Sequence, residues 1–402
     1  MEFSCPYCGG SRLEHLRNCP KIYSLIQRNQ FNQKAKKEYF GASPNVFIGR
    51  SGYPDIYVGF LSNEELSQDV DNPGLWAKSN YDIPKIIDLR SSLINSRFKA
   101  NVKNFEEKFL DITQEIAMTT KPVDVEVHLD KKPWYKVSLD NEITPYGPSV
   151  KLEKAQITQN PKIPDAVDDA VSDTDLKAGD AISYLYNKGY NEHFLTKLIS
   201  VGNLGLKNNR KLVPTRWSIT AVDDTLGKKL IGEIKDYSEY DYVAHFGGYL
   251  GNYYLILFFP EIWSYELFET YIGNPSKQEQ TETSTDYESF NGRTDYARNT
   301  VGGYYAARLG ILEYLKNKKR QASVLTLRFI TDEYYMALGV WVVREATRQA
   351  LSSKPLVFSD KDLMLKYARA IISKKFNFNL DTLLRKCILL TSHQKRLLDY
   401  SS

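Results

Sequence analysis

The sequence is poor in cysteine and has no apolar run of the length that a membrane span needs. Only four of its 402 residues are cysteine, which excludes a scaffold held together by disulfides. The most apolar run, 249–260, is too short for a span and is interrupted by Gly251 and Asn252, so it predicts a buried strand. No cationic leader with an apolar segment precedes the first cysteine, and we therefore expect a cytoplasmic protein without a membrane partner.

Three of the four cysteines lie with a histidine near the start of the sequence. Cys5, Cys8, His15 and Cys19 are spaced C-x2-C-x6-H-x3-C. Zn2+ prefers thiolate and imidazole ligands, and four of them without a carboxylate are typical of a closed, structural site rather than a catalytic one. The spacing therefore predicts a small zinc knuckle over 1–20, with two free thiols or a disulfide as the alternative.

The net charge of +4 is distributed unevenly along the chain. Residues 1–40 carry a net charge of +4 and residues 311–402 a net charge of +9, which leaves −9 on residues 41–310. Basic ends on an acidic body indicate a face that binds a polyanion such as DNA, provided that the two ends meet in space. Solvated helix faces rich in lysine explain the same distribution equally well.

The spacing of apolar residues predicts an α+β fold. Two β-rich runs, 46–48 and 56–58, flank a glycine-lined loop and predict a hairpin. Apolar residues at helical spacing predict helices over 83–100 and 102–118. We expect a mixed sheet with flanking helices, a small N-terminal zinc knuckle and a flexible C-terminal peptide tail. The other strands are expected at 123–129, 134–139, 213–222, 242–259 and 324–330, and the other helices at 181–202, 225–234, 303–316, 340–351, 361–374 and 380–390.

Residues 141–180 interrupt this pattern and are rich in proline and aspartate. A stretch of this length without periodic apolar residues is typical of a connection between two halves. The expected domains are the zinc knuckle (1–20), an N-terminal α/β lobe (21–140), the connection (141–180), a C-terminal α+β lobe (181–391) and a tail (392–402).

The segment 211–224 carries the residues best suited to phosphate chemistry. On the predicted strand, alternation places Arg216 and Ser218 on one face, where a guanidinium and a hydroxyl bind a phosphate by hydrogen bonds. Asp223 and Asp224 follow and are candidate ligands for Mg2+. The alternative is that a carboxylate caps the next helix while the arginine forms an ordinary salt bridge.

Two further residues are candidates for chemistry. Arg50 lies in a loop whose glycines let backbone N–H groups approach an anion, although a tight hairpin needs the same glycines. His245 lies beside a Gly-Gly pair and joins Asp223 and Asp224 as a candidate catalytic residue, with a structural histidine as the alternative. These groups define one functional hypothesis, a nucleotide or phosphodiester hydrolase with a phosphate and metal pocket.

The C-terminal segment 393–402 has the spacing of a docking peptide. In a 3₁₀ turn, Gln394, Leu397 and Tyr400 lie on one side and present an amide followed by two apolar side chains. Burial of these apolar side chains contributes about 1.5–3 kcal/mol each, whereas micromolar binding needs about 8 kcal/mol. Backbone and amide hydrogen bonds must supply the rest, so we expect modest affinity for a groove on a partner.

Six stretches of the sequence together resemble the Nre family of archaeal DNA repair proteins. They are the CPYC cluster, FGASPNVFIGRSGYPDIYVG, VSDTDLKAGDAI, NRKLVPTRWSITAVDDTLG, GGYYAARLGILEYL and the terminal QKRLLDY. The resemblance runs over nearly the whole chain. It implies a DNA damage repair factor with a zinc finger, whose ligands match Cys5, Cys8, His15 and Cys19.

The resemblance also gives the tail a partner. It implies that Gln394, Leu397 and Tyr400 bind the replication sliding clamp (PCNA), and Ser401 stands where a second aromatic residue is often found. We therefore expect a DNA repair protein that the sliding clamp recruits to DNA and whose basic ends contact nucleic acid.

Overall fold

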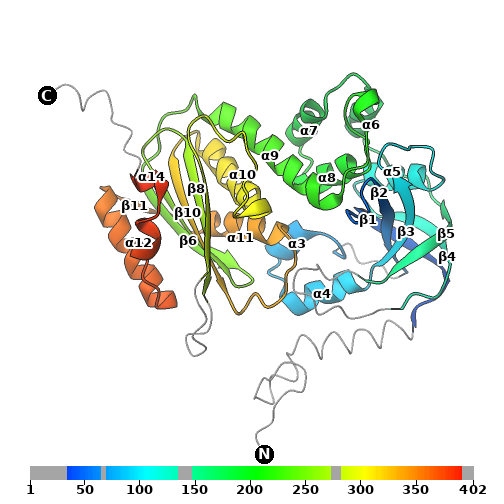
Figure 1. The fold of residues 1–402 in the computed structure, drawn as a ribbon, viewed down its shortest axis with the longest axis horizontal. Helices are drawn as coiled ribbons and strands as arrows, with labels where there is room; N and C mark the ends of the chain where they lie inside the picture. Colours follow the sequence, from blue (N-terminus) through cyan, green and yellow to red (C-terminus); the bar gives the residue numbers. More distant parts are fainter. Residues whose placement is uncertain (1–33, 65–68, 135–146, 273–281, 392–402) are drawn as a thin grey trace, which may run out of the picture. The chain divides into compact units, whose positions relative to one another are not determined.

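The chain forms two compact units, each built on its own sheet. The first unit contains residues up to Thr225 together with Met336–Leu338, and the second contains the remainder. The predicted zinc knuckle and the predicted tail both lie outside the residues that the structure describes. The computed structural model describes residues 34–64, 69–134, 147–272 and 282–391 (Figure 1).

A closed five-stranded barrel forms the centre of the first unit. Its strands are β1 (Glu38–Ile48), β2 (Asp55–Asn63), β3 (Ile94–Asn101), β4 (Val123–Leu129) and β5 (Ser149–Ile157), and helix α5 (Leu110–Met118) follows β3. The strand order is β1-β2-β3-β5-β4, and only β3 and β5 pair in parallel. This order, with a helix between β3 and β4, is that of the OB-fold, a five-stranded Greek-key barrel.

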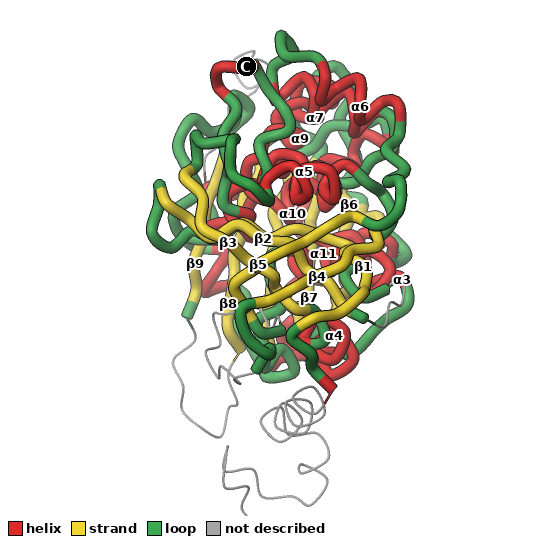
Figure 2. Tube along the Cα trace, turned by 90° about the vertical axis from the view of Figure 1, so that its right-hand side faces the viewer, coloured by secondary structure: helices red, strands yellow, loops and turns green. Residues whose placement is uncertain are grey.

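Alternation along the strands fills the barrel with apolar side chains. In β2, the inward residues Ile56, Val58 and Phe60 are fully buried, and in β4 the inward residues are valines and a leucine. Leu110 and Ile116 of α5 belong to the same core, so the helix packs against the barrel (Figure 2). Each such buried side chain contributes about 1.5–3 kcal/mol, which makes this core the main source of stability of the unit.

Most of the other helices of the first unit are short. Helix α4 shows how they begin, because the carboxylate of Asp82 accepts a hydrogen bond from the Lys85 N–H at 3.0 Å and caps its first turn. The helices of this part are α3 (Pro73–Lys78), α4 (Ile83–Ser91), α6 (Asp165–Ser172), α7 (Ala178–Asn187), α8 (Glu192–Ser200), the 3₁₀ turn η1 (Lys207–Asn209) and α9 (Thr215–Ile234), which continues into the second unit.

The second unit is a six-stranded mixed sheet with the order β11-β6-β7-β10-β8-β9. Only β10 and β8 are parallel. The strands are β6 (Tyr242–Tyr249), β7 (Asn252–Phe259), β8 (Ser264–Ile272), β9 (Thr283–Glu288), β10 (Ser323–Thr331) and β11 (Leu356–Phe358). The helices are α10 (Val301–Lys318), α11 (Trp341–Ser352), α12 (Lys361–Phe376), α13 (Asp381–Leu384) and α14 (Ile388–Thr391).

Helices cover both faces of this sheet. On β6, Tyr249 contacts Trp341 of α11 on one face, whereas Phe246 contacts Phe376 of α12 on the other. The two helical layers bury the sheet, so the inner strands are apolar on both sides, as β7 shows (Figure 1).

The α+β class with mixed sheets and flanking helices is confirmed. The hairpin of β1 and β2, strand β4 and helices α10, α11 and α12 lie where the sequence predicts them. None of the helices in the described parts of the chain has the length and apolar character that crossing a membrane requires.

Several predicted segments differ from the structure. The helix predicted over 102–118 begins only at Leu110, and the helix predicted over 181–202 is divided into α7 and α8. Two further differences concern the barrel. The single helix predicted over 83–100 is wrong, because α4 ends at Ser91 and the rest forms β3. The composition of 141–180 predicts an irregular connection, yet 149–157 form β5, which closes the barrel. Only two residues of β5, Val150 and Leu152, are buried, so its apolar periodicity is weak in the sequence.

Candidate nucleic-acid interface

The loop between β1 and β2 is held against the first turn of α9. The Thr215 hydroxyl accepts a hydrogen bond from the Ile48 N–H at 2.9 Å. The rings of Tyr53, in the loop, and Trp217, in the helix, lie 5.3 Å apart between centroids. Both rings are 46% exposed, which is unusual for residues of this size. The contacts thus fix a pair of exposed aromatic rings, one of them in the loop that also carries Arg50.

A third exposed ring lies on the outer side of the barrel. Tyr57 of β2 stands opposite Lys99 of β3, and Gly59 stands opposite Arg97. The guanidinium carbon of Arg97 lies 4.1 Å from the centre of the Tyr57 ring, and the Lys99 amine lies 5.5 Å from it. These are cation–π distances, so two cations are placed around one aromatic side chain.

The predicted phosphate-binding strand at 213–222 is wrong, because this segment is the first half of α9. Successive residues of a helix turn by about 100°, so Arg216 and Ser218 project in nearly opposite directions. Arg216 is exposed, whereas Ser218 is fully buried and its hydroxyl donates to the Val213 carbonyl at 3.3 Å. The shared face that alternation gives to these two residues therefore does not exist.

The two carboxylates that follow lie in the middle of α9. Asp223 is fully buried and Asp224 is half-buried, and neither is at the start of a helix, so the alternative of a helix cap is also wrong. Within the residues that the structure describes, no three His, Cys, Asp or Glu side chains are arranged to hold a metal ion.

His245, the third catalytic candidate, lies in a packed core. It is 1% exposed, its Nε2 is 3.0 Å from the Tyr314 hydroxyl, and its ring packs against Phe258. Burial is the main cause that lowers the pKa of His245, so the ring is neutral near pH 7. The neighbouring Gly247 has Ala350 of α11 against it, and a Cβ there would lie 2.9 Å from the Ala350 Cα. Gly247 is thus explained by helix packing, whereas a Cβ at Gly248 would collide with the backbone of β7 at Asn252.

A half-buried lysine ties helix α8 to the barrel. The amine of Lys197 donates to the carbonyls of Thr119 and Pro44 at 3.0 and 3.4 Å. Burial lowers its pKa to about 8, although the nearby charge of Asp71 acts in the opposite direction. The amine is therefore readily deprotonated in mildly alkaline solution.

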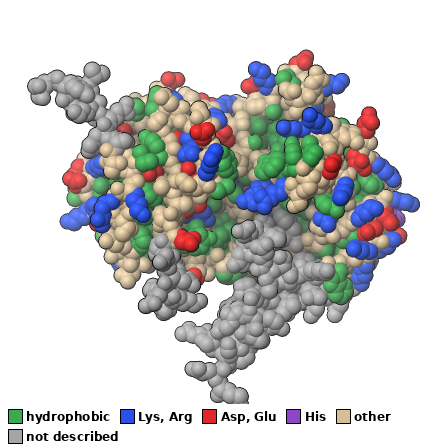
Figure 3. Space-filling model, in the orientation of Figure 1, with side chains coloured by type: hydrophobic (Ala, Val, Ile, Leu, Met, Phe, Trp, Pro, Cys, Tyr) green, Lys and Arg blue, Asp and Glu red, His purple; other side chains and the backbone are tan. Residues whose placement is uncertain are grey.

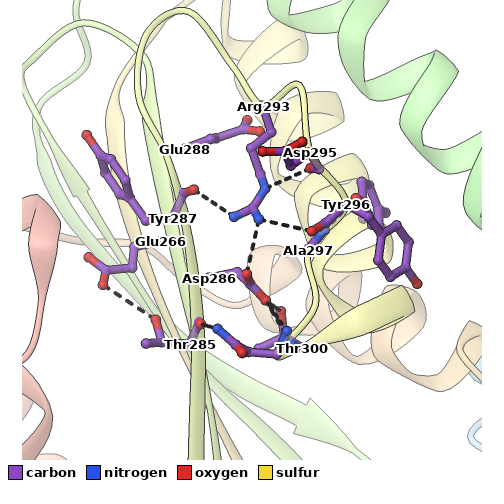
Figure 4. Close-up of polar contacts among 12 residues, drawn as sticks. Glu266, Thr285, Asp286, Tyr287, Glu288, Arg293, Asp295, Tyr296, Ala297 and Thr300 are labelled. Carbon is purple, nitrogen blue, oxygen red and sulfur yellow. Dashed lines mark hydrogen bonds and ion pairs between the residues drawn. The ribbon is translucent and has the colours of Figure 1, made fainter.

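Polar contacts order the segment between β9 and α10 (Figure 4). The carboxylate of Asp286 accepts hydrogen bonds from the Thr300 N–H at 2.8 Å and the Thr300 hydroxyl at 2.9 Å, and pairs with Arg293 at 3.2 Å. The Arg293 guanidinium also donates to the backbone carbonyls of Asp295 and Tyr296 in this segment and of Tyr287 in β9. The cluster holds a loop and the start of a helix, a structural role.

A neighbouring ion pair is more deeply buried. The guanidinium of Arg308 in α10 pairs with the carboxylate of Glu288 in β9 at 2.7 Å, and both side chains are at most 1% exposed. The indole N–H of Trp263 donates to the same carboxylate at 3.2 Å. Two buried donors thus satisfy this charge.

The end of the described chain is fixed by one carboxylate. Glu266 of β8 is fully buried and accepts hydrogen bonds from the N–H groups of Ile388 and Leu389 at 3.1 and 2.9 Å. These are the first residues of α14, whose N–H groups have no partner within the helix. Glu266 therefore fixes the position of α14, which ends at Thr391.

The sequence of β3 contains a signal for its exposed face, but the helix predicted over 83–100 conceals it. In β3, buried Phe98 and Ala100 alternate with Arg97 and Lys99, which is the period of a strand. Tyr57 holds the outward position between buried Ile56 and Val58, but single exposed aromatic residues do not identify a site from sequence alone.

Charge on the face drawn in Figure 3 gives no comparable indication. Lys and Arg side chains lie among Asp and Glu side chains across the visible face (Figure 3). The local arrangement around the barrel, rather than the net charge of the chain, therefore defines the candidate interface.

Comparison with known proteins covers almost the whole chain. Residues 13–275 match the family described as archaeal Nre, N-terminal, and residues 288–400 match the family described as archaeal Nre, C-terminal. No solved structure matches the chain.

Three named proteins are similar to this chain. A protein of Archaeoglobus fulgidus named DNA repair protein NreA is 38% identical over 92% of the chain and 94% of that protein. One of Haloferax volcanii with the same name is 36% identical over 79% of the chain and 78% of that protein. The A. fulgidus protein named DNA repair protein NreB is 34% identical over 98% of both chains.

Proposed function

Because the chain belongs to the archaeal Nre family, we propose that it acts in DNA repair. The observation that carries this proposal is the extent of the similarity, since relatives named DNA repair proteins align with the chain over 78% to 98% of their own length. The OB-fold topology of the first unit supports the proposal, because barrels of this kind serve widely to bind oligonucleotides.

The proposal includes recruitment by the replication sliding clamp through Gln394, Leu397 and Tyr400. The end of the described chain supports a tail that begins at a defined place, because Glu266 holds the start of α14 directly before it. A tethered chain acts at a high local concentration on DNA, so it needs little intrinsic affinity for the duplex. Modest clamp affinity is therefore compatible with efficient recruitment.

The proposal also includes structural Zn2+ bound by Cys5, Cys8, His15 and Cys19. Three thiolates and one imidazole form a complete tetrahedral set, which leaves no position for a substrate or a reactive water. Zinc would stabilise the N-terminal segment rather than take part in a reaction, because metal binding at such sites is coupled to folding.

Two experiments test the proposed function. Calorimetric titration of the sliding clamp should show binding of the full chain and none after deletion of residues 394–402, while thermal unfolding of the two chains coincides. In an archaeal strain that lacks its Nre proteins, expression of the wild-type chain should restore survival after DNA damage. Failure to restore survival would contradict a role in repair. Unchanged clamp binding after the deletion would contradict the proposal that the tail binds the clamp.

A further inference from the structure

Basic and aromatic residues share the outward positions of three neighbouring barrel strands with two acidic ones, Asp55 of β2 and Glu153 of β5, and Glu153 pairs with Lys37 at 3.6 Å. In register, Tyr57 of β2 lies opposite Lys99 of β3, and Arg97 of β3 lies opposite Lys151 of β5. Neighbouring strands are about 4.8 Å apart, so three cations and one ring share a small area. Lys99 and Lys151 are exposed, and Tyr57 is 37% exposed.

The opposite side of the barrel carries the other sign of charge. Glu38 of β1 and Asp124 and Glu126 of β4 occupy outward positions where these two strands pair. On the basic side, the carboxylate of Asp55 accepts a hydrogen bond from the Asn101 amide at 2.8 Å. The outer surface of this one barrel is thus polarised, and a polyanion is favoured on the side of β2, β3 and β5.

Two glycines lie beside Tyr57 and have no side chain that could cover its ring. Gly49 of the loop donates its N–H to the Tyr57 carbonyl at 2.8 Å, and Gly59 follows Tyr57 at the next outward position of β2. A Cβ at Gly59 would lie 2.5 Å from the Ser96 carbonyl oxygen, so a side chain does not fit there. The absence of a side chain at Gly59 therefore leaves the exposed part of the Tyr57 ring, beside the Arg97 guanidinium, accessible to a flat ligand group.

The loop between β1 and β2 leads directly into β2 and carries further exposed side chains. Tyr53 lies four residues before Tyr57 and contacts Trp217, and both of these rings are 46% exposed. Arg50 of this loop is exposed as well. The face of the second and third strands and the first loop are the places where OB barrels bind oligonucleotides. We call Tyr53, Tyr57, Arg97, Lys99, Lys151 and Trp217 the barrel face.

Rings combined with cations select one class of polyanion. Every nucleobase has a flat surface that stacks on an aromatic ring, and phosphates bind lysine and arginine. A duplex keeps its base surfaces stacked inside, and an acidic peptide has charge without flat groups. Only a single strand offers unstacked bases and a phosphate backbone together.

The geometry points to the barrel face as a binding site for single-stranded DNA. Bases stack on Tyr57 and on the pair of Tyr53 and Trp217, while Arg97 and Lys99 hold phosphates between them. The choice of DNA rather than RNA rests on the proposed function in repair. In this role the clamp tail brings the chain to DNA, and the barrel face holds the strand that damage or processing exposes.

The test measures fluorescence anisotropy of labelled oligothymidylate of about 15 nucleotides with the full chain. Stacking contributes about 1–3 kcal/mol per base, so Tyr57→Ala and Trp217→Ala should each weaken binding roughly 5- to 150-fold. Arg97→Ala should weaken binding and lower the dependence of log affinity on log salt by about 0.7 for the lost phosphate contact. Tyr57→Phe keeps the ring and should bind as the wild type does.

Matched control variants lie in the second unit. Tyr271→Ala removes a ring that is 56% exposed, and Lys374→Ala removes an exposed positive charge. Both should bind the oligonucleotide as the wild type does, and unchanged thermal unfolding of all variants would show that their folds are intact. A labelled duplex and an oligouridylate of the same length complete the set.

Loss of affinity confined to Tyr57→Ala, Trp217→Ala and Arg97→Ala supports the inference. Equal affinity of these variants and the controls would overturn it, as would tighter binding of the duplex or of oligouridylate, or no binding by the wild type. The survival assay separates the two proposals. If the wild type restores survival but the variants bind the oligonucleotide normally, only the proposal that the barrel face binds single-stranded DNA is overturned. If the wild type does not restore survival, the role in repair is overturned.

Discussion

The Cys387 thiol donates a hydrogen bond to the carboxylate of Glu266 at 3.1 Å inside the second unit. Both side chains are fully buried. Burial and then the negative charge of Glu266 raise the pKa of the thiol far above its usual range. The thiolate, which is the reactive form, is therefore almost absent in the folded chain.

Cys387 should not react with a thiol reagent such as Ellman's reagent until the chain unfolds. If zinc binds as proposed, the native zinc-loaded chain should release little colour, removal of zinc by a chelator should expose Cys5, Cys8 and Cys19, and denaturant should expose Cys387. Elemental analysis of the purified chain measures the zinc directly. Reaction of Cys387 in the native state would contradict its burial, and a chain without zinc would contradict the metal site.

Lys197 should make stability increase with pH in the alkaline range. Its pKa is about 8 in the folded chain and near 10.5 when unfolded, so between these values the unfolded chain binds the extra proton. The free energy of unfolding should therefore rise by about 1.4 kcal/mol per pH unit over this window from this group alone, relative to Lys197→Met.

Urea unfolding of the wild type and of Lys197→Met from pH 7 to 10.5 measures the difference between their free energies of unfolding. The contributions of groups that titrate in both proteins cancel in this difference. Lys374→Met, a change at an exposed lysine, is the control and should show no such trend. A constant difference between the wild type and Lys197→Met would show that the amine is well solvated.

Arg308→Met should destabilise the second unit by about 3–5 kcal/mol, because it leaves the Glu288 carboxylate buried without its ion-pair partner. The control is Arg369→Met, which removes an ion pair with Asp381 whose side chains are more than 40% exposed. Such exposed pairs contribute about 0–1 kcal/mol. Similar losses in the two variants, measured by urea unfolding, would mean that the Glu288 pair is solvated.

Gly59→Ala should lower the free energy of unfolding by about 1–3 kcal/mol, because the new methyl group collides with the Ser96 carbonyl between β2 and β3. In α9, Gly232 has nothing within 4 Å of an added Cβ. Gly232→Ala should instead stabilise the chain by about 0.5–1 kcal/mol through helix propensity. Thermal unfolding distinguishes the two directions, and stabilisation by Gly59→Ala would show that the strands can separate at this point.

Local periodicity of apolar residues predicts many of the helices and strands, but it does not predict that five strands close into a barrel. Strand β4 has strict alternation and was predicted with its observed ends, Val123 and Leu129. The barrel depends on pairing of β3 with β5 across about fifty residues, which no local pattern encodes. Strand β5 is mostly exposed, so its apolar signal is weak.

The start of α9 shows why the candidate phosphate site was misplaced. Trp217 and Ile219 alternate with polar residues as in a strand, but the buried positions Ser218, Val222 and Leu226 recur every four residues. Two of these are apolar and the first is a serine, so the helical stripe becomes clear only over a longer window. The predicted phosphate site of Arg216 and Ser218 depends on the two-residue period of a strand, whereas the segment has the period of a helix.

A closed barrel has no edge on which another chain can add a strand. The first unit therefore resists domain swapping and sheet-to-sheet aggregation through its strands. The six-stranded sheet has two edges, β11 and β9, and β11 is only three residues long with Val357 68% exposed. Among the described strands, β11 and β9 are the edges open to strand addition, and the barrel remains available to a ligand that brings no strand of its own.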